Sequence, residues 1–151
     1  MKTIGIVGYS GSGKTTLVEN LVERLRERGR VATIKSIKDD IEIDEEGKDT
    51  YRHRMAGAEK VVGVTPSITF EISQDGKSGY KNECEKLSRI LNELSEDGFD
   101  YVVVEGFKNS DIPKIIVGDL DESDVHGEII DKIDTSAYID FNDLIDKIQD
   151  L

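Results

Sequence analysis

The sequence predicts an α/β fold in which a mostly parallel sheet is covered by helices on both faces. Short apolar runs rich in valine and isoleucine alternate along the chain with segments whose apolar residues recur at helical spacing. That alternation is typical of βαβ units, whose crossovers make the strands parallel and place helices on the sheet. The run Val102–Val104 is continuously apolar, as expected of a strand that is buried on both faces.

A glycine-rich loop follows the first apolar run, Ile4–Val7. Residues 8–15 are Gly-Tyr-Ser-Gly-Ser-Gly-Lys-Thr and match the pattern G-x-x-x-x-G-K-[ST]. In this pattern the glycines let backbone N–H groups converge on phosphates, the lysine reaches the β- and γ-phosphates, and the hydroxyl ligates Mg²⁺. The sequence therefore predicts a P-loop NTPase-like fold, with Lys14 and Thr15 in those two roles. The dinucleotide-binding pattern G-x-G-x-x-G fits less well, because Thr16 occupies the position of its last glycine.

Strands are expected at short apolar runs that are flanked by turn-forming residues. They are Thr3–Val7, Val31–Ile34, Ile68–Ile72, Tyr101–Val104 and Lys114–Val117. The segment Gln74–Gly79 is rich in turn-forming residues, so we expect a surface connection there.

Helices are expected where apolar residues lie three and four positions apart. The first follows the glycine-rich loop and is expected to stop at Gly29. Another is expected from about Lys81 to Asp97, with Gly98 ending it. The last begins at Asn142, with Asn142 or Asp140 as its N-cap.

Length, charge and cysteine content limit the class of protein. A chain of 151 residues suits a single domain, residues 1–151, that buries about 70% of its unfolded surface. The net charge of −12 disfavours nucleic-acid binding, because affinity for a polyanion comes largely from lysine and arginine. The single Cys84 has no partner for an internal disulfide, and no apolar run is long enough to span a bilayer. We therefore expect a cytoplasmic protein that binds neither nucleic acid nor a membrane.

An acidic residue, Glu105, stands where the predicted buried strand Tyr101–Val104 ends. A carboxylate at the end of a buried strand is costly unless it has a partner, and a metal-assisted phosphate site needs one at this place. We expect Glu105 to hold Mg²⁺ directly or through water. The alternative is a strand-end carboxylate that caps the next turn.

A charged segment, Gly47–Arg54, is typical of a helix start, with Asp49 as its expected N-cap. Lys48 and Arg52 are expected on one face, where they suit a second phosphate group or an anionic partner. The alternative is a solvated helix whose arginines pair with the acidic segment before it. That segment, Asp39–Gly47, is either a switch-like loop over the phosphates or a solvated hairpin.

Other chemical patterns are weak. His53, His126 and Cys84 are far apart in the sequence and give no zinc or nickel cluster. The acidic run that begins at Asp119 resembles a calcium loop, but Asp124 replaces its glycine and Ile130 its bidentate glutamate. We expect an acidic surface loop there.

Several segments together resemble the MobB family, the molybdopterin-guanine dinucleotide biosynthesis proteins B. They are the loop Gly8–Thr15, Thr33–Lys35, Gly47–Arg54 with Ala56–Ala58, and Asp100–Lys108 followed by Ile112–Lys114. The resemblance covers residues 1–58 and about 100–117. The segments Gly47–Arg54 and Val104–Lys108 are the more specific part of it, since the loop alone occurs in very many proteins.

The resemblance implies a protein that binds GTP with Mg²⁺, hydrolyses it slowly at most and forms a homodimer. Its implied partner is a MobA-type guanylyltransferase, which joins GMP to molybdopterin, and molybdopterin or its guanine dinucleotide is a further candidate ligand. By motif position, phosphates and Mg²⁺ are held by Gly11, Ser12, Gly13, Lys14, Thr15 and Thr16. Glu105 serves the metal, and Lys14 and Glu105 are the candidate catalytic residues. The site is further lined by Lys35, Asp49, Arg52 and Lys108.

One feature departs from the family pattern, and another leaves the choice of nucleotide undecided by the residues alone. Many family members carry a histidine-rich stretch where this chain has Ser36–Asp40. The guanine-reading pattern N-K-x-D is absent, because Lys108–Asp111 has the wrong spacing, so GTP rather than ATP rests on the resemblance. A small-molecule or nucleotide kinase and a metal-insertion GTPase are the alternative functions on the same loop.

Overall fold

The structure is a computed structural model that describes residues 1–73 and 82–151. The chain divides into two compact units, one of residues 1–36 with 82–151 and the other of residues 37–81. We call them the sheet unit and the hairpin unit. The prediction of a single domain over residues 1–151 stays a prediction. The turn expected at Gln74–Gly79 lies outside the described residues.

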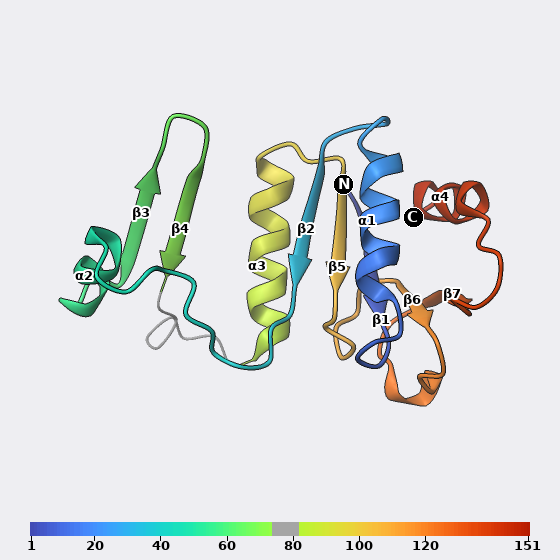
Figure 1. Cartoon of the computed structure of the whole chain (residues 1–151). Helices are drawn as coiled ribbons and strands as arrows, with labels where there is room; N and C mark the ends of the chain where they lie inside the picture. The colour runs from blue at the N-terminus through green and yellow to red at the C-terminus, as the bar shows by residue number, and fades with distance from the viewer. Residues whose placement is uncertain (74–81) are drawn as a thin grey trace. The chain divides into compact units, whose positions relative to one another are not determined.

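The sheet unit is built on a five-stranded sheet in the order β2-β5-β1-β6-β7, and every neighbouring pair is parallel. Figure 1 shows the arrows of β2 and β5 running side by side in the same direction. The strands are β1 (Lys2–Val7), β2 (Val31–Lys35), β5 (Tyr101–Glu105), β6 (Lys114–Val117) and β7 (Ile129–Ile133).

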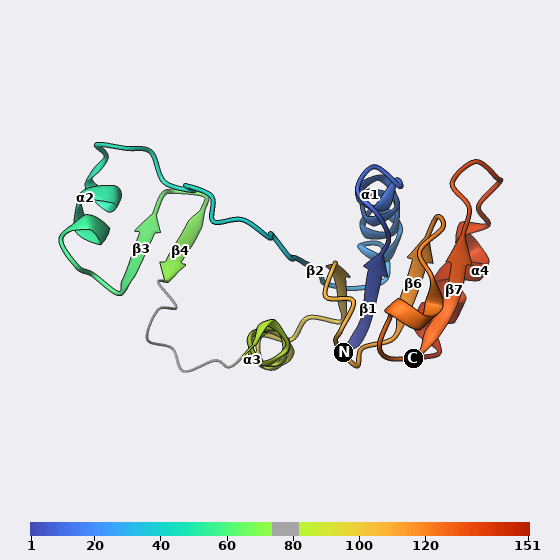
Figure 2. The ribbon, with the colours of Figure 1, turned by 90° about the horizontal axis from the view of Figure 1, so that it is seen from below.

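Helices cover both faces of this sheet (Figure 2). The apolar sides of α1 (Lys14–Leu25) and α4 (Phe141–Gln149) pack on one face, and α3 (Glu83–Glu96) packs on the other. The predicted fold class, an α/β fold with a mostly parallel sheet between helices, is confirmed.

Strand β5 shows why the valine run is buried on both sides. Side chains alternate between faces along a strand, so Tyr101 and Val103 join the core beneath α1, whereas Val102 and Val104 meet Leu87 of α3. All three valines are fully buried. The same alternation directs the next odd-numbered residue, Glu105, to the α1 face.

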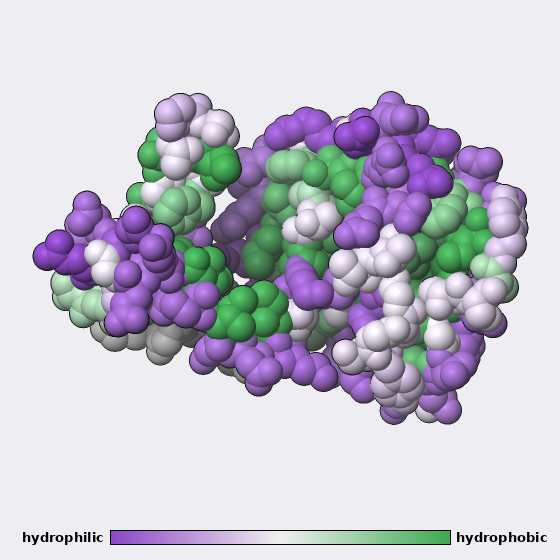
Figure 3. Space-filling view, viewed as in Figure 1, coloured by the Kyte–Doolittle hydropathy of each residue, from purple (hydrophilic) through white to green (hydrophobic). Residues whose placement is uncertain are grey.

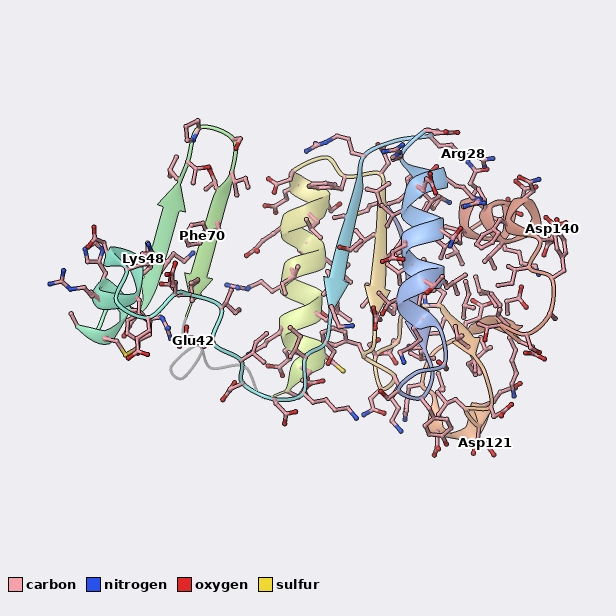
Figure 4. The ribbon with its side chains drawn as sticks, in the orientation of Figure 1. Arg28, Glu42, Lys48, Phe70, Asp121 and Asp140 are labelled. Carbon is pink, nitrogen blue, oxygen red and sulfur yellow. The ribbon has the colours of Figure 1, made fainter. Side chains whose placement is uncertain are left out.

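In the sheet unit, helix ends agree with the sequence in two places and differ in one. Gly98, at φ 77°, follows α3 in the left-handed conformation expected of a helix stop. Asp140 caps α4 by accepting from the backbone N–H groups of Asn142 and Asp143 (Figure 4). The stop expected at Gly29 is wrong, since α1 ends at Leu25. Gly29 instead gives room to a neighbouring carboxylate, because a Cβ there would lie 2.5 Å from Asp100 Oδ2.

The hairpin unit holds α2 (Asp49–Met55) and an antiparallel pair, β3 (Lys60–Val64) and β4 (Thr69–Ser73). The strand expected at Ile68–Ile72 is therefore present but forms its own two-stranded sheet. Phe70, labelled in Figure 4, lies across Gly63 at the paired position, so the ring fills the space that a side chain would need. Helix α2 packs against β3.

In the described part of the chain, no helix combines the length and the apolar character needed to cross a bilayer.

Candidate functional site

The glycine-rich loop joins β1 to α1 at the carboxyl edge of the sheet. Gly8 passes so close to β6 that a Cβ on it would lie 2.3 Å from the carbonyl oxygen of Val117. Gly11, in contrast, has open space around it. Gly13 is the N-cap of α1 and supplies no side-chain cap, which leaves the first N–H groups of the helix for an anion. The loop therefore has the shape expected of a phosphate-binding turn.

Lys14 reaches back across this loop, where its Nζ donates a hydrogen bond to the carbonyl oxygen of Tyr9 at 2.6 Å. A charged phosphate oxygen is a stronger acceptor for an ammonium group than a neutral carbonyl. The lysine is thus placed at the loop with an acceptor that a phosphate can replace.

Thr15, Lys35 and Glu105 meet beside the loop, although they are far apart in the sequence. Lys35 Nζ lies 2.6 Å from Glu105 Oε1, and Thr15 Oγ1 donates to Glu105 Oε2 at 3.2 Å. Lys35 and Glu105 are partners in the β2–β5 register, so strand pairing fixes the first contact. The Glu105 side chain is only 12% exposed. The structure therefore brings together three of the residues predicted to form the site.

The oxygen donors of this cluster fit a magnesium ion. Mg²⁺ is bound in nucleotide sites by one or two oxygen-bearing side chains, with phosphates and water completing its coordination. The Thr15 hydroxyl and the Glu105 carboxylate are donors of that kind, and they lie within hydrogen-bonding distance of each other. These two side chains are the ones that would hold the ion.

Two further loops pack against the glycine-rich loop. Thr135, which follows β7, places its methyl group against Gly13 and its hydroxyl 3.4 Å from the carbonyl oxygen of Ser12. Gly118, which follows β6, lies beneath the side chain of Ser12. The hydroxyl of Ser12 is buried without a hydrogen-bond partner in the described residues. Sequence reasoning missed Thr135, because charged Asp131 and Lys132 hide the strand before it.

The β5–β6 connection is held by Lys114, a residue that sequence reasoning left without a role. Its side chain is fully buried, and its Nζ donates to the carbonyl oxygens of Ser110, Ile112 and His126. Burial lowers the pKa of Lys114. Because this connection begins directly after Glu105, Lys114 helps to fix the chain that leaves the site.

Asp49 and Arg52 belong to the hairpin unit, so their lining of the nucleotide site stays a prediction. They lie on α2, where their side chains form an exposed ion pair of 3.7 Å. The expected N-cap is wrong: Lys48 occupies the N-cap position of α2 without a side-chain cap hydrogen bond, and Asp49 is the first residue of the helix.

The acidic segment before α2 contacts that helix. Glu42 pairs with Arg54 (Figure 4), whose guanidinium lowers the pKa of the carboxyl group. Thr50 donates to Asp44 at 3.0 Å. The Arg54 contact matches the alternative in which arginines of the helix pair with the acidic segment, whereas Arg52 pairs with Asp49 of its own helix. No strand forms in residues 39–47, so the hairpin alternative for this segment is wrong. Its action as a switch stays a prediction.

The remaining candidates lie at the surface of the sheet unit. Thr16 is exposed in the first turn of α1, and Lys108 is exposed in the connection after β5. The carbonyl oxygen of Lys108 accepts from the backbone of His126 at 2.8 Å. In the acidic run after β6, Asp121 accepts from the backbone and hydroxyl of Ser123 (Figure 4), which agrees with a local turn.

Comparison with known proteins identifies the family. A family model described as MobB, Molybdopterin guanine dinucleotide synthesis protein B, matches residues 3–132. The chain belongs to the MobB family. The resemblance read from the glycine-rich loop, Gly47–Arg54 and Val104–Lys108 is confirmed.

A putative molybdopterin-guanine dinucleotide biosynthesis adapter protein of Methanocaldococcus jannaschii is 37% identical over 98% of this chain. The chain spans 59% of that relative's length. The crystal structure of Bacillus subtilis MobB shares the fold, with a TM-score of 0.65 and 23% identity over 88% of this chain and 77% of that one. The urease accessory protein UreG of Mycolicibacterium gilvum is 28% identical over 90% of this chain and 73% of its own length.

Proposed function

We propose that this MobB-family chain is an accessory protein of molybdenum-cofactor biosynthesis that holds GTP with Mg²⁺. The observation that carries the proposal is the cluster at the carboxyl edge of the sheet, where the glycine-rich loop and Lys14 adjoin the contact of Thr15 and Lys35 with Glu105. The name of the M. jannaschii relative supports the biosynthetic role.

Each group in the cluster has a task in this proposal. The backbone of Gly11–Thr16 and the Lys14 ammonium bind the phosphates, because N–H groups at a helix start and a lysine both favour negative charge. Thr15 and Glu105 hold Mg²⁺. Lys35 and Lys108 complete the lining within the sheet unit.

Slow hydrolysis at most is part of the proposal. A general base must be free to take a proton from water, whereas this proposal assigns the Glu105 carboxylate, which also accepts a hydrogen bond from Thr15, to Mg²⁺. The site is better suited to holding a nucleotide than to turning it over. Single-turnover hydrolysis of bound GTP measures this directly, and rapid release of phosphate by the isolated protein would contradict it.

A homodimer is proposed on the basis of the hairpin unit. Val62, Val64 and Ile68 are 51%, 76% and 62% exposed, and Figure 3 shows apolar side chains on the surface of this unit. Both strands of the β3–β4 pair also have a free edge among the described residues, and free edges of this kind pair readily with a second chain. We place the protein in the cytoplasm, beside a MobA-type guanylyltransferase as its partner enzyme.

Competition binding tests the assigned ligands. A fluorescent GTP analogue bound to the protein is displaced with GTP, ATP, molybdopterin or molybdopterin-guanine dinucleotide, in the presence of Mg²⁺ or of EDTA. Preferential displacement by GTP, together with co-elution with a MobA-type enzyme, is the expected result. Equal and weak displacement by GTP and ATP without any such association would exclude the proposal.

The two alternatives have their own readouts. Steady phosphoryl transfer to an acceptor would favour a kinase. Tight stoichiometric nickel binding would favour a metal-insertion GTPase. No group of three or more histidine, cysteine or acidic side chains suited to a metal occurs in residues 1–73 and 82–151.

A further inference from the structure

Glu105 makes its shortest contact with a lysine of its own chain. Its Oε1 atom lies 2.6 Å from Lys35 Nζ, compared with 3.2 Å between its Oε2 atom and the Thr15 hydroxyl. The carboxylate that is suited to hold Mg²⁺ is therefore already neutralised by an ammonium group.

The two partners differ in their freedom to move. Glu105 is 12% exposed and follows the fully buried valines of β5, so its carboxylate is fixed. Lys35 is 55% exposed at the end of β2, so its long side chain can turn without disturbing the core. An ion pair with one fixed and one mobile partner opens by movement of the lysine alone.

An ammonium group at hydrogen-bond distance from one oxygen of a carboxylate weakens the binding of a divalent cation to that carboxylate, because the two cations repel each other at that range. We propose that Lys35 is a built-in counter-ion which keeps Glu105 from accepting Mg²⁺ until a nucleotide binds. The phosphates then draw the ammonium away and free the carboxylate. Lys35 is a positioning residue in this account, and its effect on Mg²⁺ depends on whether nucleotide is present.

Lys14 shows the same arrangement on the other side of the loop. Its Nζ donates to the Tyr9 carbonyl oxygen at 2.6 Å, another acceptor inside the protein. Both lysines thus donate to acceptors inside the protein, and both are within the cluster that a polyphosphate would enter. Two ammonium groups that exchange internal acceptors for phosphate oxygens offset part of the negative charge of the incoming ligand.

Linkage turns the proposal into a measurable relation. The factor by which Mg²⁺ raises nucleotide affinity equals the factor by which nucleotide raises Mg²⁺ affinity. If Lys35 weakens Mg²⁺ binding only in the nucleotide-free protein, removing the charge of Lys35 raises the Mg²⁺ affinity of that protein. The factor by which nucleotide raises Mg²⁺ affinity then falls by the same ratio.

The inference rests on the proposed nucleotide site, but its first test needs no nucleotide. Mg²⁺ binding to the nucleotide-free protein is measured by calorimetry, and Mn²⁺ binding by the electron paramagnetic resonance of the free ion. Lys35→Gln is expected to raise the affinity at least about tenfold. Lys35→Arg, which keeps the charge, is expected to match the wild type. Lys132→Gln removes an exposed lysine of an edge strand at the opposite side of the sheet and serves as the matched control.

The double variant Lys35→Gln with Glu105→Gln separates this site from the acidic surface, since it is expected to lose the gained affinity. Thermal unfolding and circular dichroism of each variant report whether the fold is intact. Unchanged Mg²⁺ affinity in a folded Lys35→Gln variant would overturn the inference, even if GTP binds. Failure of the wild type to bind GTP would overturn the proposed function instead, and the competition between Lys35 and Mg²⁺ would still be measurable.

Discussion

At the scale of single residues, the loop depends on a positive charge at one position and on the absence of a side chain at another. Lys14 contributes charge, and its Nζ donates to the backbone carbonyl oxygen of Tyr9 in the loop, an acceptor that a phosphate can replace. Gly8 contributes space, because β6 leaves no room for a side chain there. Substitutions at these two positions are therefore expected to fail in different ways, one in binding and the other in folding.

Lys14→Ala is expected to weaken GTP binding about tenfold to a hundredfold, because charge-assisted hydrogen bonds contribute about 1.5–3 kcal/mol. Isothermal calorimetry with Mg²⁺ present measures the change. Lys132→Ala is the control for a general loss of positive charge and is expected to bind GTP as the wild type does. Equal affinity of the Lys14→Ala variant and the wild type would refute the phosphate-binding role.

Gly8→Ala and Gly11→Ala form a matched pair within the same loop. At Gly11 a Cβ meets nothing within 4 Å, so only the φ of +78° is unfavourable for alanine, a cost of about 1–2 kcal/mol. At Gly8 the Cβ would also overlap the Val117 carbonyl oxygen. Urea unfolding is expected to show the larger loss of stability for Gly8→Ala. Equal losses would show that the close approach of β6 does not constrain this loop.

At the scale of elements, the connection between β5 and β6 is stabilised from inside by Lys114. Its ammonium group donates to three backbone carbonyl oxygens, which belong to Ser110, Ile112 and His126. Those carbonyls lie on both sides of β6 in the sequence. The buried lysine thus ties the chain that leaves Glu105 to the loop that enters β7.

Lys114→Met is expected to lower the free energy of unfolding by about 2–4 kcal/mol, because buried carbonyl oxygens lose their donors. The difference from the wild type should also depend on pH. Burial lowers the pKa of Lys114 from its usual value of 10.5, so the unfolded chain holds the proton more tightly between the lowered pKa and 10.5. Wild-type stability relative to the variant therefore rises with pH through that window and is constant below it.

Urea unfolding of both proteins from neutral to alkaline pH checks this behaviour. A variant as stable as the wild type would show that the three carbonyl groups find other donors. A constant difference throughout the alkaline range would contradict the lowered pKa.

The elements that sequence reasoning predicted correctly are those whose apolar pattern is continuous, such as Val102–Val104. Strand β7 was missed because Asp131 and Lys132 interrupt it, and the structure explains the first charge by a 2.8 Å pair between Asp131 and Lys147 of α4. Strand β3 was missed because Gly63 suggests a turn, whereas the Phe70 ring covers that glycine. Side-chain partners on neighbouring elements made these charged and flexible residues compatible with strands.

Residues of the candidate site were likewise predicted where the sequence carries a local signal and missed where it does not. Lys14, Thr15 and Glu105 were found because a local motif or the end of a buried strand marks them. Lys35 was predicted only from family resemblance, because its contact with Glu105 depends on the β2–β5 register. Thr135 carries no local signal, because its contact with Gly13 depends on the order of β6 and β7 in the sheet.

At the scale of the whole molecule, the chain combines a sheet unit with a P-loop fold and a hairpin unit that exposes apolar residues. Two-stranded sheets are marginally stable alone, so association of a second chain is expected to stabilise this one. Val64, 76% exposed, lies on the face of the hairpin opposite the buried residues of β3.

Val64→Glu is therefore expected to shift a wild-type dimer toward monomer in light-scattering measurements coupled to size-exclusion chromatography. Asn92→Glu, at an exposed position of α3 in the sheet unit, is the control for an added surface charge. A dimer that is unaffected by Val64→Glu, or a monomeric wild type at high concentration, would contradict a dimer formed through this unit.

The central claim is that the loop, Lys14 and the Thr15–Glu105 pair form a site for a nucleotide with Mg²⁺. Calorimetric titration of GTP into the wild-type protein, once with Mg²⁺ and once with EDTA, tests it most directly. We expect saturable binding at one site per chain, with an affinity at least about tenfold higher when Mg²⁺ is present. Absence of saturable binding in both titrations, or the same affinity with and without Mg²⁺, would contradict the claim.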